Sequence, residues 1–77
     1  MRPICDIARD IRSEWKKVYY GAVPYLNVML EMVDIKGNYM YDSNRDIVLR
    51  FLSNAGTFRG GNAKTLKDEL KAHLNTK

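Results

Sequence analysis

Apolar residues recur every three or four positions over much of the chain, which is the spacing of one face of an α-helix. The first such stretch has its apolar side at Ile4, Ile7, Ala8, Ile11, Trp15, Val18 and Tyr19. Pro3 suits the first turn, where its missing N–H would have no intrahelical partner anyway. Gly21 follows closely, as glycines that end helices do. We therefore predict a first helix over residues 3–19.

A second helix is predicted to begin at Pro24 and to run to about Val33. Ten residues between turn signals favour a helix over a strand. Its residues are nearly all apolar: Tyr25, Leu26, Val28, Met29, Leu30, Met32 and Val33. A helix that is apolar on most of its circumference is either the most buried one or has a second face for a partner. A homodimer formed through this helix is compatible with the pattern.

Residues 34–42 form the longest predicted connection, with a turn signal at Gly37-Asn38. Residues 39–41 are expected to be either a short extended piece or a lid over the core. Ser43, followed three positions later by Asp46, resembles a capping box and predicts the start of a third helix. The buried stripe of this helix is expected at Ile47, Val48, Phe51, Leu52 and Ala55.

Gly56 is expected to end the third helix, and Asn62 to cap the start of the fourth. The fourth helix is predicted from Ala63 to Leu74, with a buried face at Ala63, Leu66, Leu70 and Leu74. Because 77 residues allow only one domain, the sequence predicts a single all-α domain over residues 1–77, a compact bundle of about four short helices. Its central cluster is expected to contain Trp15, Leu26, Met29, Phe51, Leu52, Leu66 and Leu70.

The composition excludes some means of stabilisation. One cysteine cannot form an intramolecular disulfide, and one cysteine with one histidine cannot form a structural zinc site. No apolar run approaches the roughly 20 residues that span a bilayer. The N-terminus interleaves acids and arginines, unlike a signal peptide. We expect a cytoplasmic protein without a cofactor, metal or membrane association.

The residues also resemble a known group of proteins. The pattern consists of D-I-A-R-D-I-R at 6–12, W-K-K-V-Y-Y-G-A-V-P-Y-L at 15–26, I-V-x-x-F-L-x-N-A-x-x-F-R-G at 47–60 and A-K-x-x-K-x-E-L at 63–70. This set resembles small proteins encoded by phages and other mobile elements of Gram-positive bacteria. The resemblance implies a small accessory protein in the host-cell cytoplasm, and it transfers no catalytic or binding residue. Proteins of that origin often bind a host or defence protein, including CRISPR effectors, or nucleic acid.

The chain offers few candidates for catalysis. His73 is expected to be a helix-end histidine that favours the helix dipole, and Cys5 a small, partly buried residue. The loop Phe58-Arg59-Gly60-Gly61 precedes a helix, as phosphate-binding loops do, but it lacks the pattern G-x-x-x-x-G-K-[ST]. We therefore expect a protein that is not an enzyme.

Nucleic-acid binding is the alternative function. The net charge of +4 is concentrated towards the C-terminus, where residues 59–77 carry five basic against two acidic side chains. The third and fourth helices would form a helix-turn-helix, with the fourth as the DNA-reading helix. Its candidate residues are Arg59, Asn62, Lys64, Lys67 and Lys71. Against it, the expected connection over residues 55–61 exceeds the usual three or four residues, and Asp68 and Glu69 would lie near phosphates.

Binding of a protein partner is the favoured function. The chain contains five tyrosines, one tryptophan and four methionines, which are common at protein interfaces. Adjacent tyrosines cannot all face one core, because neighbouring residues on a helix or strand point in different directions. Two interpretations are equally compatible with this pattern: the tyrosines rim a small core with their hydroxyls in water, or an exposed aromatic cluster beside Lys16 and Lys17 forms a contact surface. Its candidate residues are Lys16, Tyr19, Tyr20, Tyr39 and Tyr41.

Overall fold

The structure is a computed structural model that describes residues 1–39 and 41–75, without the side chain of Tyr39. Its helices are α1 (Ile4–Glu14), α2 (Val23–Met29), α3 (Asn44–Ser53) and α4 (Ala63–Leu74). Two short strands, β1 (Asn38–Tyr39) and β2 (Asp42–Ser43), connect α2 to α3. The predicted all-α bundle of about four short helices is confirmed.

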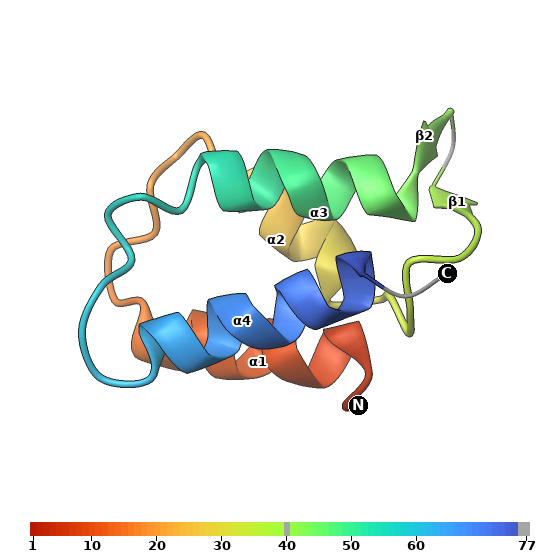
Figure 1. Cartoon of the computed structure of the whole chain (residues 1–77). Coiled ribbons are helices and arrows are strands. Elements are labelled where there is room, and N and C mark those ends of the chain that lie inside the picture. Colours follow the sequence, from red (N-terminus) through yellow and green to blue (C-terminus); the bar gives the residue numbers. More distant parts are fainter. Residues whose placement is uncertain (40, 76–77) are drawn as a thin grey trace.

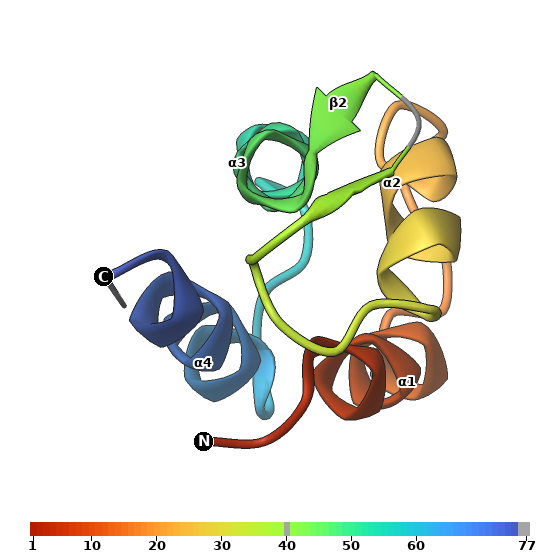
Figure 2. The same ribbon diagram turned by 90° about the vertical axis from the view of Figure 1, so that its right-hand side faces the viewer.

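The helices surround one common core. Each helix packs against the next in the chain, and α4 returns to pack on α1. In Figure 1, α4 runs antiparallel to both α1 and α3. Figure 2 shows these three helices close to end-on, with α2 lying across them between α1 and α3. The molecule measures 30 × 24 × 18 Å.

This arrangement gives the molecule two different ends. The connections over residues 15–22 and 54–62 lie together at the end on the left of Figure 1, which we call the loop end. The β1–β2 hairpin, the start of α1 and the end of α4 lie at the opposite end, which we call the hairpin end. Residues on these two ends are therefore separated by the long dimension of the bundle.

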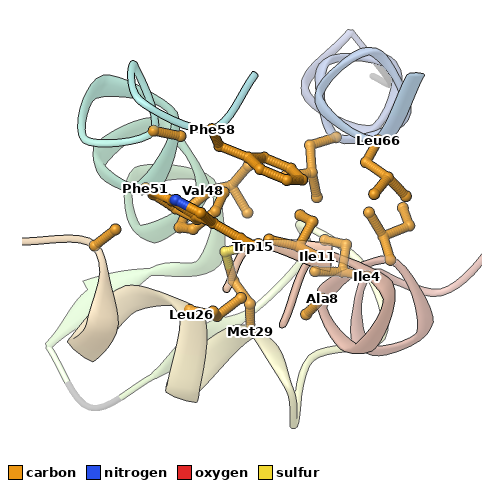
Figure 3. Packing of buried hydrophobic residues seen from close by; sticks show 14 of the residues in the cluster. Ile4, Ala8, Ile11, Trp15, Leu26, Met29, Val48, Phe51, Phe58 and Leu66 are labelled. Atoms are coloured by element: carbon orange, nitrogen blue, oxygen red, sulfur yellow. The ribbon is translucent and has the colours of Figure 1, made fainter. Parts of the chain in front are cut away.

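Trp15 lies at the centre of the core (Figure 3). Its ring stacks on Phe58, with centroids 5.2 Å apart, and meets Phe51 edge-on at 6.2 Å. Of the predicted core residues, all are buried except Leu52, which is half-buried. Phe58, an aromatic in a loop between glycines, joins them with only 4% of its surface exposed.

The first helix is shorter than predicted. α1 ends at Glu14, and Trp15 already has extended dihedral angles of φ −90° and ψ 91°. The helical spacing of Val18 and Tyr19 was therefore misleading, because both lie in the following connection. Packing of Trp15 between two phenylalanines overrides the local periodicity, as tertiary contacts often override helix propensity.

The second helix is also shorter than predicted, and it is not the most buried one, which was the first of the two alternatives that its apolar sequence allowed. α2 has seven residues, of which Leu26 and Met29 are buried. The chain leaves the helix before Val33, whose side chain is 66% exposed. The carbonyls of residues 32 and 33 instead accept hydrogen bonds from the N–H groups of Cys5 and Ile4, at 2.7 and 2.8 Å. These residues satisfy the first turn of α1, which Pro3 does not cap.

The helix ends show which local signals were correct. The Ser43 hydroxyl accepts a hydrogen bond from the Asp46 N–H at 3.1 Å, which confirms the predicted cap of α3. Asn62 occupies the N-cap position of α4 as predicted, but its side chain makes no capping hydrogen bond. α3 ends at Ser53, with Asn54 rather than Gly56 at the C-cap position, and the Asn54 amide donates to the Arg50 carbonyl at 2.8 Å.

The connection between α2 and α3 contains a small antiparallel hairpin. Asn38 pairs with Ser43 and Tyr39 with Asp42, and Gly37 adopts a φ of 90° before the first strand. Of residues 39–41, Tyr39 lies in β1, in agreement with the short extended piece. Tyr41 is fully exposed and does not cover the core, and Met40 lies outside the described residues.

Candidate binding surface

Two adjacent tyrosines form an exposed pair at the loop end. The rings of Tyr19 and Tyr20 lie 4.8 Å apart at an angle of 52°. Tyr20 is 80% exposed and Tyr19 41% exposed. A side-chain hydrogen bond with Tyr20 raises the pKa of Tyr19, with smaller contributions from the Tyr20 charge and from burial. The two rings therefore form one exposed aromatic pair.

Gly21 allows the Tyr19 ring to lie close to the backbone. A Cβ atom at position 21 would stand 2.6 Å from Cε2 of Tyr19 and 2.9 Å from Oδ1 of Asn54. The same tyrosine borders a hollow of about 230 Å³, which we call the aromatic hollow. Its lining residues are Tyr19, Ser53, Asn54, Gly56 and Thr57.

A second hollow adjoins the first along the α3–α4 connection. It has a volume of about 270 Å³, and we call it the basic hollow. Its lining residues are Phe58, Arg59, Gly60, Ala63, Lys64, Lys67, Asp68 and Lys71. Residues 56–57 border the aromatic hollow and residues 58–60 the basic one, so a short run of chain separates the two. Gly60 and Gly61, with φ of 81° and 50°, allow the turn into α4.

Two of the basic side chains that line this hollow are positioned by specific contacts. Nε of Arg59 donates to the Gly56 carbonyl at 3.0 Å. Nζ of Lys67 lies 5.8 Å from the centroid of the Phe58 ring, within the range of a cation–π contact. Burial lowers the pKa of Lys67, and the positive charges of Lys71 and Arg59 lower it further. The cations are therefore close enough to repel one another.

The structure brings together most of the residues predicted for an acidic or nucleic-acid partner. Arg59, Lys64, Lys67 and Lys71 all border the basic hollow. Asn62 does not, because its amide donates to Oε2 of Glu14 on α1 at 3.3 Å. The hollow also contains Asp68, whose carboxylate pairs with Lys64 at 3.2 Å.

The residues predicted for a protein interface are divided between the two ends. Lys16, Tyr19 and Tyr20 are exposed in the connection at the loop end. Tyr41 belongs to the hairpin end and cannot join them in one contact cluster. The side chain of Tyr39 lies outside the described part of the structure. Tyr19 and Tyr20 therefore lie together at the loop end, apart from Tyr41.

His73 is in the last turn of α4, as expected, but it is buried. Its Nε2 atom lies 2.6 Å from the carbonyl oxygen of Arg2 and joins the N-terminal segment to α4.

Cys5 is half-buried, with Sγ 3.9 Å from Oδ1 of Asp6. Among the described residues, no three histidine, cysteine, aspartate or glutamate side chains are grouped as a metal site. In the same part of the chain, no helix is long and apolar enough to cross a membrane.

Sequence reasoning missed the role of Phe58. The sequence places this residue in a glycine-bounded loop, whereas in the structure its ring forms part of the core and borders the basic hollow. The available signal was a large aromatic residue between Gly56 and Gly60, since a bulky apolar side chain in a polar loop commonly fixes that loop to the core.

No protein-family model matches this chain, and no curated protein or solved structure is detectably similar to it. The mobile-element origin implied by the sequence pattern therefore stays a prediction.

Proposed function

We propose that this protein is a non-enzymatic binding protein that acts on another protein through its loop end. The contact surface consists of Tyr19, Tyr20 and the two adjoining hollows. With the mobile-element origin implied by the sequence pattern, the partner is a host or defence-system protein, and inhibition of a CRISPR effector is one activity of this kind. The protein acts in the cytoplasm of the host cell.

The observation that carries this proposal is the exposure of the tyrosine pair. Tyr20 presents 80% of its surface to solvent while its ring is held against that of Tyr19. Tyrosine supplies a large apolar area and a hydroxyl at a small cost in side-chain entropy, and it is enriched among residues that dominate binding energy. A partner that buries this pair gains apolar contact without reorganising the core.

Nucleic acid is the second candidate partner, and the gathering of four basic side chains around one hollow favours it. The helix arrangement does not favour a helix-turn-helix. The connection from Asn54 to Asn62 is much longer than three or four residues, and α4 returns antiparallel to α3 in Figure 1. The buried Phe58 ring also offers no exposed face on which a base would stack.

Affinity capture from a host lysate tests the proposed function. The tagged protein is used with and without nuclease treatment, and Tyr20→Ala is compared with Tyr41→Ala. Both variants remove an exposed tyrosine, but they lie at opposite ends. We expect one or more proteins to be retained after nuclease treatment. Tyr20→Ala should weaken their binding by about 2 kcal/mol, or roughly 30-fold. Loss of all captured protein on nuclease treatment, or equal effects of the two variants, would contradict the proposal.

A further inference from the structure

The charge of the basic hollow is incompletely balanced. Of its four cationic side chains, Lys64 is paired with Asp68 within the hollow. Among the described residues, no carboxylate lies within 4.0 Å of the charged groups of Arg59, Lys67 or Lys71. Because they share one hollow, their potentials add there. The lowered pKa of Lys67 agrees with this mutual repulsion.

We propose that the basic hollow receives the carboxylates of an acidic segment of the protein partner. This inference rests on the proposed function and specifies the chemistry of the partner. A carboxylate that enters the hollow gains charge-assisted hydrogen bonds from Arg59 and the two lysines. The Gly60 backbone leaves the mouth open, since a Cβ atom added there would meet nothing within 4 Å.

The distribution of acids favours a protein segment over a nucleic-acid backbone. Asp68 lies inside the hollow, and Oε1 of Glu14 would be 3.6 Å from a Cβ atom at Gly61. One carboxylate therefore stands within the basic surface and another beside the turn that leads into α4. A duplex needs positive charge along a path of successive phosphates, whereas this hollow concentrates its cations at one point.

The neighbouring aromatic surface fits the same occupant. Residues 56–57 line the aromatic hollow, and the next residues, 58–60, line the basic hollow. A single extended segment that crosses this run places acidic side chains against Lys67 and an apolar side chain against Tyr19. The inferred ligand is therefore an acidic peptide segment with at least one aromatic or large aliphatic residue.

The direct test is an NMR titration of the isotope-labelled protein with a blocked pentapeptide, Glu-Glu-Tyr-Glu-Glu. A short DNA duplex and inorganic phosphate are titrated in parallel at physiological salt. The double variant Lys67→Gln with Lys71→Gln is compared with Lys36→Gln with Arg45→Gln, which removes the same charge from exposed positions outside the loop end. We expect peptide-induced shifts concentrated in residues 56–71. The first variant should weaken peptide binding about tenfold, and the control less than about threefold.

Each other outcome overturns the inference. Tighter binding of the duplex to the same residues would assign the hollow to nucleic acid, and saturable binding of phosphate but not of the peptide would assign it to a small oxyanion. Equal losses in both double variants would show a general charge effect. In the capture experiment, retention of the partner by the Lys67 and Lys71 variant, together with loss by Tyr20→Ala, would reject this inference and leave the proposed function intact.

Discussion

Replacing Phe58 with alanine tests whether the α3–α4 connection is fixed to the core. The Phe58 ring is 4% exposed and stacks on Trp15 at 5.2 Å, so its loss removes a fully packed side chain. Phe-to-Ala changes in cores cost about 3–5 kcal/mol, including the lost aromatic contact. At roughly 0.05–0.15 kcal/mol per residue, a chain of 77 residues has a total stability of about 4–12 kcal/mol. The variant should therefore be largely destabilised.

Urea denaturation measures this effect, with fluorescence of Trp15, the single tryptophan in the sequence, as the signal. Phe58→Leu keeps most of the apolar volume and should cost about 1.5 kcal/mol or less. Tyr20→Ala removes an exposed aromatic and should change the free energy of unfolding by only about 0.5 kcal/mol. A cost below about 1 kcal/mol for Phe58→Ala would refute the packing described for this connection, and with it the place of the Phe58 ring in the lining of the basic hollow.

Three further changes test the helix cap, the tyrosine pair and the N-terminal ion pair. Ser43→Ala removes the cap of α3 and should cost about 1 kcal/mol, measured as a decrease in Tm of about 4–8 °C. Gly21→Ala would place Cβ 2.6 Å from Cε2 of Tyr19. It should displace the ring, detected by changed NMR shifts of both tyrosines, at a stability cost of about 1 kcal/mol or less. Arg2 hydrogen bonds lower the pKa of Glu69, so the unfolded chain binds more protons in the acid range. The stabilisation that the ionised Glu69 carboxylate gains from Arg2 is therefore present near neutral pH and lost on acidification. Glu69→Gln should lower Tm at neutral pH but not at acid pH.

Helical periodicity correctly predicted the fold class and most of the buried residues of α3 and α4, and the Ser43 cap was also correct. These signals act within a few residues of one another, so one sequence contains them completely. The ends of α1 and α2 were wrong because they depend on distant contacts. α1 ends where the Trp15 ring packs against Phe51 and Phe58. The residues after α2 leave the helix because their carbonyls accept hydrogen bonds from N–H groups in the first turn of α1.

The candidate surface was predictable only in part. Lys64, Lys67 and Lys71 follow the helical repeat, so their common face was visible in the sequence. Their position around a hollow with Arg59 was not, because it depends on Phe58 entering the core. The separation of Tyr41 from Tyr20 was equally hidden, since it depends on which connections gather at each end of the bundle.

Site-specific photo-crosslinking tests the central claim, that a protein partner binds the loop end. A benzophenone amino acid replaces Tyr20 in one sample and Tyr41 in the other, so that a probe of the same size stands at each end. Both proteins are irradiated in nuclease-treated host lysate. We predict a discrete protein adduct from position 20 and little or none from position 41. The adduct from position 20 should be reduced when the same chain also carries Lys67→Gln and Lys71→Gln. Adducts from position 41 alone, an adduct of the chain with itself only, or none from position 20 would contradict the claim.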